Sequence, residues 1–117
     1  MAANAIFFGW NRGIPGRENI SAEHFQQFIG YLTNLKTSGT ITGFDPVFLR
    51  PHGGDLSGFF LIHGDSQKLH ALTETTEWLE HSVRGTHHLE SSGYVFADTG
   101  SEIPTRMAQW IKAIPHS

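Results

Sequence analysis

The chain has 117 residues, of which 38% are hydrophobic and 16% are charged, and its formal net charge is −3. This length suits one globular domain, and the composition is too apolar for a disordered chain. Eight Lys and Arg stand against eleven Asp and Glu, so the sequence has no basic excess that would favour nucleic acid or an anionic membrane as a partner. We therefore expect a single domain over residues 1–117 and neither of those partners.

Cysteine is absent, which excludes disulfides, thiolate nucleophiles and cysteine-based metal sites. Residues 1–10 lack the pattern of a signal peptide, and no apolar run reaches the length of a membrane span. A soluble, cytoplasmic protein is the expectation. The chain also has eight histidines, so mild acid should change its charge strongly.

The first half of the chain predicts one helix and three strands. Apolar residues at helical spacing begin at Ser21, a suitable N-cap, and end at Ser38 and Gly39. Pro46 lacks a backbone donor, so the strand that contains it should lie at a sheet edge. Glycine and proline separate this strand from the next and predict a hairpin loop. The predicted segments are a strand at 5–10, the helix, a strand at 40–50, a loop at 51–55 and a strand at 58–63.

The second half predicts two more helices around one strand. Asp65 or Ser66 caps a helix that ends before Arg84 and Gly85. Its expected buried stripe is Leu69, Leu72, Thr76, Leu79 and Val83. A strand follows at 93–97, and Pro104 opens a last helix. The apolar side of that helix, expected to dock on its own subunit or on a partner, carries Met107, Trp110, Ile111 and Ile114.

This order of elements predicts a ferredoxin-like α+β domain, β-α-β-β-α-β with a C-terminal helix. Right-handed crossovers place both main helices on one face of an antiparallel four-stranded sheet. The strands at 5–10 and 58–63 are apolar on both sides, so the other sheet face also needs a cover. We expect a second copy of the chain to provide it, in a homodimeric α/β barrel.

Three phrases carry a resemblance to known proteins: residues 44–49, residues 51–59, and Gly64-Asp65 before Lys68-Leu69. With them, the stretch from 7 to 100 resembles an uncharacterised bacterial family of small single-domain proteins. More remotely it is similar to the dimeric α/β-barrel superfamily, which includes YCII-related proteins and haem-degrading and antibiotic-biosynthesis monooxygenases. The resemblance implies the fold but not a function.

Two sets of residues loosely match sites of that superfamily. His24 and Asp45 resemble the His and Asp pair of YCII-related proteins. Asn4 or Asn11, with Trp78 and His88, imitate the Asn, Trp and His of haem-degrading members. Neither match has the flanking motif of its family, so no role is transferred to these residues.

The predicted topology brings polar residues together at one end of the sheet, where two strands end and two begin. Arginine provides a rigid fork of donors, so a small anionic or carboxylate ligand would suit this end. His63 ends an apolar strand and is expected to point either into the predicted barrel or toward the core, where it could contact a ligand. The ligand-binding candidates are Trp10, Arg12, Arg50, His52, Asp55, His63 and Tyr94, with Asn11, His87 and His88 close to them. The simpler alternative is that the arginines are solvated loop ends and that His63 is structural.

A second histidine cluster is expected on the helix at 66–83. His70, Glu74, Glu77 and His81 have a spacing that places them on one helical face, which could hold a metal. This face lies opposite the predicted apolar stripe, so a solvated face is the preferred interpretation and no metal is expected. The adjacent His87 and His88 project in different directions and are assigned to a loop.

No nucleophile elbow, phosphate-binding loop or dinucleotide fingerprint occurs, and no cofactor is expected. The leading hypothesis is a homodimeric domain that binds a small, partly apolar or anionic molecule. The alternative is a cofactor-independent enzyme of monooxygenase-like or isomerase-like type, in which His52 or His63 moves a proton and Arg12 or Arg50 holds an anionic group. A third hypothesis is a purely structural or protein-interaction dimer.

Overall fold

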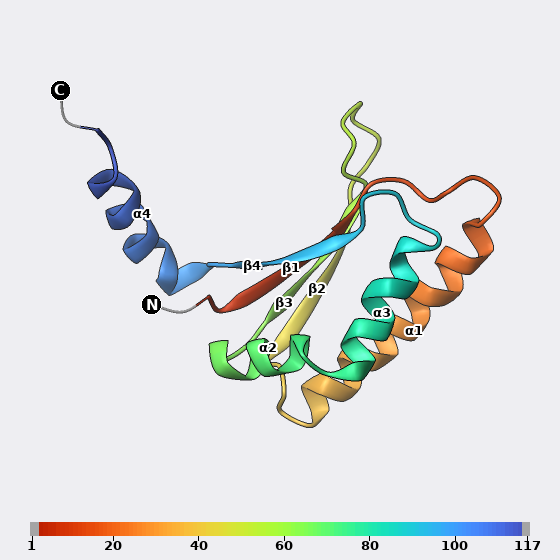
Figure 1. Cartoon of the computed structure of the whole chain (residues 1–117), viewed down its shortest axis with the longest axis horizontal. Coiled ribbons are helices and arrows are strands. Elements are labelled where there is room, and N and C mark those ends of the chain that lie inside the picture. The colour runs from red at the N-terminus through yellow and green to blue at the C-terminus, as the bar shows by residue number, and fades with distance from the viewer. Residues whose placement is uncertain (1–2, 116–117) are drawn as a thin grey trace.

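A four-stranded antiparallel sheet forms the centre of the molecule, and three helices cover one of its faces (Figure 1). The computed structural model describes residues 3–115, so the ends of the predicted domain at 1, 2, 116 and 117 lie outside it. The strands are β1 (Ala5–Trp10), β2 (Gly43–Phe48), β3 (Gly58–His63) and β4 (Gly93–Ala97). The helices are α1 (Glu18–Thr37), α2 (Ser66–Thr73), α3 (Thr76–Thr86) and α4 (Ile103–Lys112), with a 3-10 turn η1 (Gly100–Glu102) before the last.

The strand order β2-β3-β1-β4 confirms the α+β class and the antiparallel sheet, and it is compatible with a ferredoxin-like fold. β2 is an edge strand, as Pro46 predicts. The hairpin between β2 and β3 is also confirmed, with Phe48 opposite Gly58 in the register. The sheet of this chain is open, so the predicted barrel would need a second copy.

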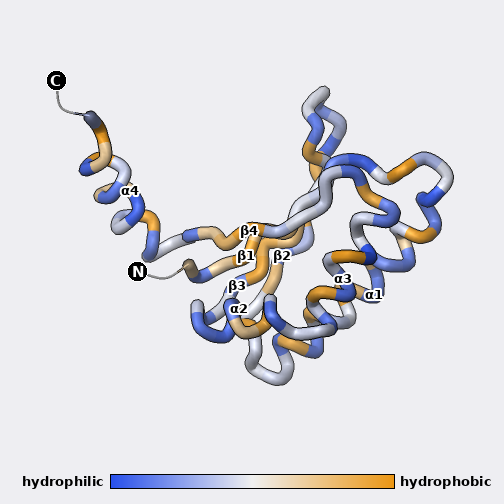
Figure 2. Tube along the Cα trace, in the orientation of Figure 1, coloured by the Kyte–Doolittle hydropathy of each residue, from blue (hydrophilic) through white to orange (hydrophobic). Residues whose placement is uncertain are grey.

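The core fills the space between the sheet and the three helices. Alternate residues of β1 and β3 point into it, because successive side chains of a strand face opposite sides of a sheet. Figure 2 shows the hydrophobic residues gathered along these strands. The fully buried hydrophobic side chains include Ile6, Leu32, Ile41, Ile62, Leu69 and Trp78.

The helix predicted at 66–83 is two helices, which corrects the sequence interpretation. α2 ends at Thr73, and Thr75 starts α3 by accepting a hydrogen bond from the backbone N–H of Trp78, at 3.4 Å. The break rotates the second helix about its axis. Trp78 therefore enters the core, whereas Leu79 and Val83 of the predicted stripe are 47% and 57% exposed.

Smaller differences concern the ends of elements. α1 begins at Glu18 rather than at Ser21, and Ser21 lies in its first turn. β2 covers residues 43–48 and is shorter than the predicted strand at 40–50. No helix of residues 3–115 is long and apolar enough to cross a membrane.

Two apolar surfaces lack a cover within the described chain. The sheet face opposite the helices, here called the open face, carries Phe7, Phe59, Leu61 and Val95, and Val95 is 59% exposed. α4 extends away from the sheet (Figure 1), and none of its residues is buried. The predicted apolar side of α4 is therefore in solvent, with Trp110 67% exposed.

Candidate functional site

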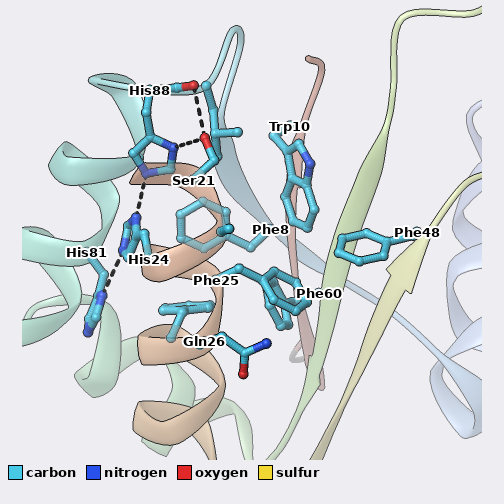
Figure 3. Close-up of a pocket in the computed structure, with 14 residues that line it drawn as sticks. Phe8, Trp10, Ser21, His24, Phe25, Gln26, Phe48, Phe60, His81 and His88 are labelled. Atoms are coloured by element: carbon cyan, nitrogen blue, oxygen red, sulfur yellow. Dashed lines mark hydrogen bonds between the residues drawn. The ribbon is translucent and has the colours of Figure 1, made fainter. Parts of the chain in front are cut away.

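A pocket of about 360 Å³ opens between the sheet and helices α1 and α3 (Figure 3). Most of its wall is aromatic and is formed by Phe8, Trp10, Phe25, Phe28, Phe48 and Phe60. One side is polar and is formed by Ser21, His24, His81 and His88, with Gln26 close to the aromatic wall. Ala22, Gly85 and Leu89 complete the lining.

The aromatic wall follows from the alternation of the strands. Phe8 and Trp10 of β1 share the helix-facing side with Phe60 of β3, and Phe25 of α1 packs over them. The Phe25 ring centre is 5.2 Å from that of Phe60 and 4.9 Å from that of Phe48. Aromatic rings in such contact form a rigid apolar surface.

Because Gly58 has no side chain, it leaves room for the indole of Trp10. The two residues are opposite each other in the antiparallel register. A Cβ at Gly58 would lie 2.7 Å from Cζ2 of Trp10 and 2.7 Å from the carbonyl oxygen of Val47. Any other residue at position 58 would therefore push the indole or the edge strand aside.

The polar side is a continuous chain of hydrogen bonds, here called the histidine chain. Ser21 Oγ is 2.6 Å from Nδ1 of His88, and His88 Nε2 is 2.7 Å from Nδ1 of His24. His24 Nε2 is in turn 3.0 Å from Nδ1 of His81. Figure 3 shows the three rings one below the other beside α1.

Three segments bring these side chains together. Ser21 and His24 are three residues apart on α1 and so share one of its faces. His81 lies on α3, and His88 follows the end of that helix, where its N–H donates to the Gly85 carbonyl at 3.2 Å. The backbone N–H of Ile14 donates to the His88 carbonyl at 2.8 Å and fixes this turn against the segment after β1.

Burial keeps the histidine chain uncharged. Together with smaller contributions from the nearby Arg84, His88 and His81, it lowers the pKa of His24 from 6.5 to about 4. Burial also lowers the pKa of His88, with a contribution from Arg84. The pKa of His81 is lowered by burial as well, against the opposing effect of Glu77. At neutral pH each ring therefore has one donor and one acceptor nitrogen.

When all three rings are neutral, the hydrogen bonds of the histidine chain can run in either of two directions. In one, Ser21 donates to His88, and each ring donates through Nε2 to Nδ1 of the next. In the other, every bond is reversed, and the Ser21 hydroxyl donates to the His88 carbonyl oxygen at 3.3 Å. To pass from the first arrangement to the second, one proton moves along each of the three bonds, Ser21 takes up a proton and Nε2 of His81 releases one, as in a proton relay.

No protein-family model and no curated protein matches the chain. The resemblance to the dimeric α/β-barrel superfamily stays a prediction.

The histidine chain is not arranged as a metal site. Within residues 3–115, no group of three or more His, Cys, Asp or Glu side chains could hold a metal ion. The nitrogens of the three rings face one another rather than a common point. The helix-face cluster predicted from spacing is divided: Glu74 and Glu77 are exposed, the His70 ring stacks on Phe96, and His81 turns to the pocket.

Of the ligand-binding candidates, Trp10 lines this pocket and the others lie elsewhere. Arg12 is exposed and lies 3.9 Å from the Glu90 carboxylate. Arg50 and Asp55 are exposed on the hairpin loop that projects from the sheet in Figure 1. Tyr94 packs against Phe8 and Trp78 in the core. The predicted group is thus not gathered in one cavity, and His63 lies at the opposite end of the sheet from Trp10.

The two remaining candidate histidines have local partners. His52 uses both ring nitrogens within the hairpin loop: Nδ1 accepts from the Gly54 N–H at 3.1 Å, and Nε2 lies 2.9 Å from the Leu56 carbonyl oxygen. His63 points to the open face, where its Nε2 is 3.0 Å from the Asp45 carboxylate. Asp45 is therefore the partner of His63 and not of His24, which lies on the helix-facing side.

The Asn, Trp and His set of haem-degrading proteins is not assembled either. Asn4 is tied to Thr99, whose N–H it accepts at 2.9 Å. Asn11 lies at the other end of β1, where its N–H donates to the Glu90 carbonyl at 2.9 Å. Trp78 is fully buried among aromatic rings, and His88 belongs to the pocket.

Sequence reasoning missed the polar side of the pocket, although part of it left a signal. His24, Phe28 and Tyr31 are spaced by four and three residues, so His24 lies on the apolar face of α1. A histidine in that position is inside the protein. No comparable signal exists for His88, which is buried in a turn and is held by bonds to residues far away in the sequence.

Proposed function

We propose that this chain is a homodimeric small-molecule-binding domain whose pocket takes a flat, largely apolar and uncharged ligand. The observation that carries the proposal is the pocket itself: an aromatic wall of six rings faces a hydrogen-bonding wall of Ser21 and three histidines. Ligand pockets commonly combine a mainly apolar lining with a few polar groups that fix the orientation of the ligand.

The charge of the lining selects the kind of ligand. Among residues 3–115, no Lys, Arg, Asp or Glu lines the pocket, and burial holds its histidines neutral at pH 7. A charged ligand would lose its hydration without gaining an opposite charge. The pocket therefore favours the apolar form of the expected ligand over the anionic one.

Binding of N-phenyl-1-naphthylamine, an uncharged aromatic probe that fluoresces in apolar surroundings, tests the pocket. Ala22 is exposed at the pocket wall, so Ala22→Phe should fill the pocket without disturbing the core. We expect saturable binding that Ala22→Phe weakens at least tenfold. Asn34→Phe, at an exposed position of the same helix, is the matched control and should leave binding unchanged. Equal weakening by both variants, or no binding, would contradict the proposal.

The proposed dimer rests on the two uncovered apolar surfaces. Four strands at about 4.8 Å spacing and about 3.3 Å per residue give the open face a flat area of roughly 400 Å². A stable interface commonly needs about 800 Å² from each partner, so this face alone falls short. α4 offers further exposed apolar side chains on the same chain. A second copy supplies a matching surface for both at once, as a symmetric interface requires.

Light scattering during size-exclusion chromatography tests the dimer. We expect the mass of two chains for the native protein. Val95→Lys places a charge on the open face and should shift the protein toward the monomer. Thr33→Lys, at an exposed position of α1, should not. A monomeric native protein at high concentration would overturn this part of the proposal.

A further inference from the structure

Ser21 occupies the position of a nucleophile next to a base. Its Oγ is 2.6 Å from Nδ1 of His88 and borders the pocket. The other nitrogen of His88 is 2.7 Å from His24, so the ring that would act as base is itself held in place by a third group. A nucleophile, a base and an orienting group in hydrogen-bond contact are the general geometry of nucleophilic catalysis by serine.

We propose that Ser21 is an acyl-accepting nucleophile activated by His88, and that the pocket cleaves activated esters and thioesters of flat, apolar acyl groups. The proposal rests on the proposed function, because the same aromatic wall would hold the acyl group.

Every bond and proton of the proposed cleavage is accounted for by Ser21, His88, the substrate and water. Ser21 Oγ forms a bond to the acyl carbon while its proton moves to Nδ1 of His88. The bond from the acyl carbon to the leaving group then breaks, and the leaving alkoxide or thiolate takes that proton from His88. Water attacks the acyl-serine in the second half, again giving its proton to His88, and the carboxylic acid leaves as Ser21 regains its proton.

In the first of the two directions, His24 and His81 give His88 the tautomer that this step needs. Nδ1 of His88 accepts only when its Nε2 carries the proton and donates to His24. His24 then donates through Nε2 to His81, at 3.0 Å. His24 and His81 are thus positioning residues, which act through the ring of His88.

The first turn of α1 adds a favourable field. The N-terminus of this 20-residue helix has no side-chain cap and carries a partial positive charge, which Glu18 in the first turn offsets in part, and Ser21 lies within the same turn. Side chains of a helix lean toward its N-terminus, so the Ser21 hydroxyl lies toward the positive end. Negative charge that develops on the acyl oxygen near Ser21 is stabilised there.

The chemistry of the histidine chain limits the substrates to those with good leaving groups. The third member of a serine triad is commonly a carboxylate that stabilises the protonated histidine. Here that place belongs to neutral His24, and Arg84 acts against positive charge on His88. His88 is therefore a weak base, and the leaving group must depart with little help. Thioesters and aryl esters meet this condition, whereas amides do not.

Covalent labelling tests the proposal directly. An alkyl fluorophosphonate without charge reacts with activated serines, and intact mass with peptide mapping locates the adduct. We expect one adduct per chain, on Ser21, that Ser21→Ala abolishes and His88→Gln slows at least tenfold. Ser82→Ala is the matched control, because Ser82 Oγ donates to the Trp78 carbonyl outside the pocket. The release of 4-nitrophenolate from 4-nitrophenyl benzoate should likewise be lost in Ser21→Ala, slowed in His88→Gln and unchanged in Ser82→Ala. The absence of an adduct on Ser21 would overturn the proposal.

A cysteine variant keeps the test valid if Ser21→Ala is unstable. The chain has no native cysteine, so Ser21→Cys carries a single thiol of nearly the same shape. Iodoacetamide should alkylate it at least tenfold faster than it does in the double variant with His88→Gln. Equal rates would show that His88 does not activate position 21.

The naphthylamine probe separates the two proposals. Probe binding without a serine adduct would remove the nucleophile and leave the binding domain in place. The absence of both would remove the pocket proposal and, with it, the nucleophile.

Discussion

The hydrogen bonds of the histidine chain require neutral rings. His24 has a histidine nitrogen at 2.7 Å on one side and at 3.0 Å on the other. A neutral His24 donates to one and accepts from the other, whereas a protonated His24 could only donate. Charging it would also place a cation in a buried site beside Arg84. Geometry and burial thus favour the same protonation state.

The free energy of unfolding should therefore fall in mild acid. His24 titrates near 6.5 when unfolded and near 4 when folded, so between these values the unfolded chain binds more protons. Acidification from pH 6.5 to pH 4 should lower the unfolding free energy by roughly 3 kcal/mol from this residue alone. The pKa values of His88 and His81 are lowered too and add in the same direction.

Urea unfolding at several pH values between 7.5 and 4.5 measures this effect. His24→Asn should lower stability at pH 7.5 but flatten the dependence on pH, because the group that titrates is gone. A native protein equally stable at pH 7.5 and pH 5 would contradict the prediction.

A second prediction at the level of one residue concerns Gly58. Gly58→Ala forces the new Cβ against the Trp10 indole and the Val47 backbone, at a cost of about 1–3 kcal/mol for such overpacking. The naphthylamine probe should also bind more weakly, because Trp10 lines the pocket. Gly93→Ala is the matched control in β4, since nothing lies within 4 Å of its added Cβ. The two variants should differ in both urea midpoint and probe affinity, and equal values would refute the steric argument.

At the scale of elements, the break between α2 and α3 shapes the site. A single helix over 66–83 would bury Leu79 and Val83, whereas the observed break turns Trp78 and His81 inward. Thr75 holds the break: its hydroxyl donates to the Leu72 carbonyl at 2.7 Å, and its oxygen accepts from the Trp78 N–H.

Thr75→Ala should remove this cap and lower the unfolding free energy by about 1 kcal/mol, the usual effect of losing an N-cap. Thr76→Ala is the control, because no hydrogen bond of the Thr76 side chain occurs within residues 3–115. Urea unfolding of the two variants provides the comparison. A larger loss in Thr76→Ala would assign the break to another cause.

The elements that the sequence predicted correctly are those with strong local signals. β1 is an apolar run that ends before a segment rich in glycine, β3 is an apolar run between glycines, Pro46 marks the edge strand, and the hairpin loop is rich in glycine and proline. The helix break has a weak signal, since the apolar spacing continues through Thr75. The site depended on that break and on long-range contacts such as Ser21 to His88, which local patterns do not report. The hydrogen-bonded histidines could therefore not be assembled from the sequence.

At the scale of the whole molecule, α4 is the helix that buries none of its residues against its own chain. Arg106 of α4 lies 2.9 Å from the carboxylate of Asp98, which follows β4, but no residue of α4 is buried. A chain ending at Thr99 should thus keep its sheet and the helices α1 to α3, as amide spectra in NMR would show. If α4 covers a second copy, the truncated chain should dissociate at a concentration at least tenfold higher than the full chain. Equal dissociation would assign the interface to the open face alone.

The three tryptophans lie in three different environments that fluorescence can distinguish. Trp10 borders the pocket, Trp78 is fully enclosed by the core, and Trp110 is in solvent on α4. Enclosed indoles emit at shorter wavelengths than solvated ones, so each should contribute its own spectral band. Variants in which two of the three are replaced by Phe would each keep one tryptophan, and these would report separately on pocket occupancy, on the integrity of the fold and on the environment of α4.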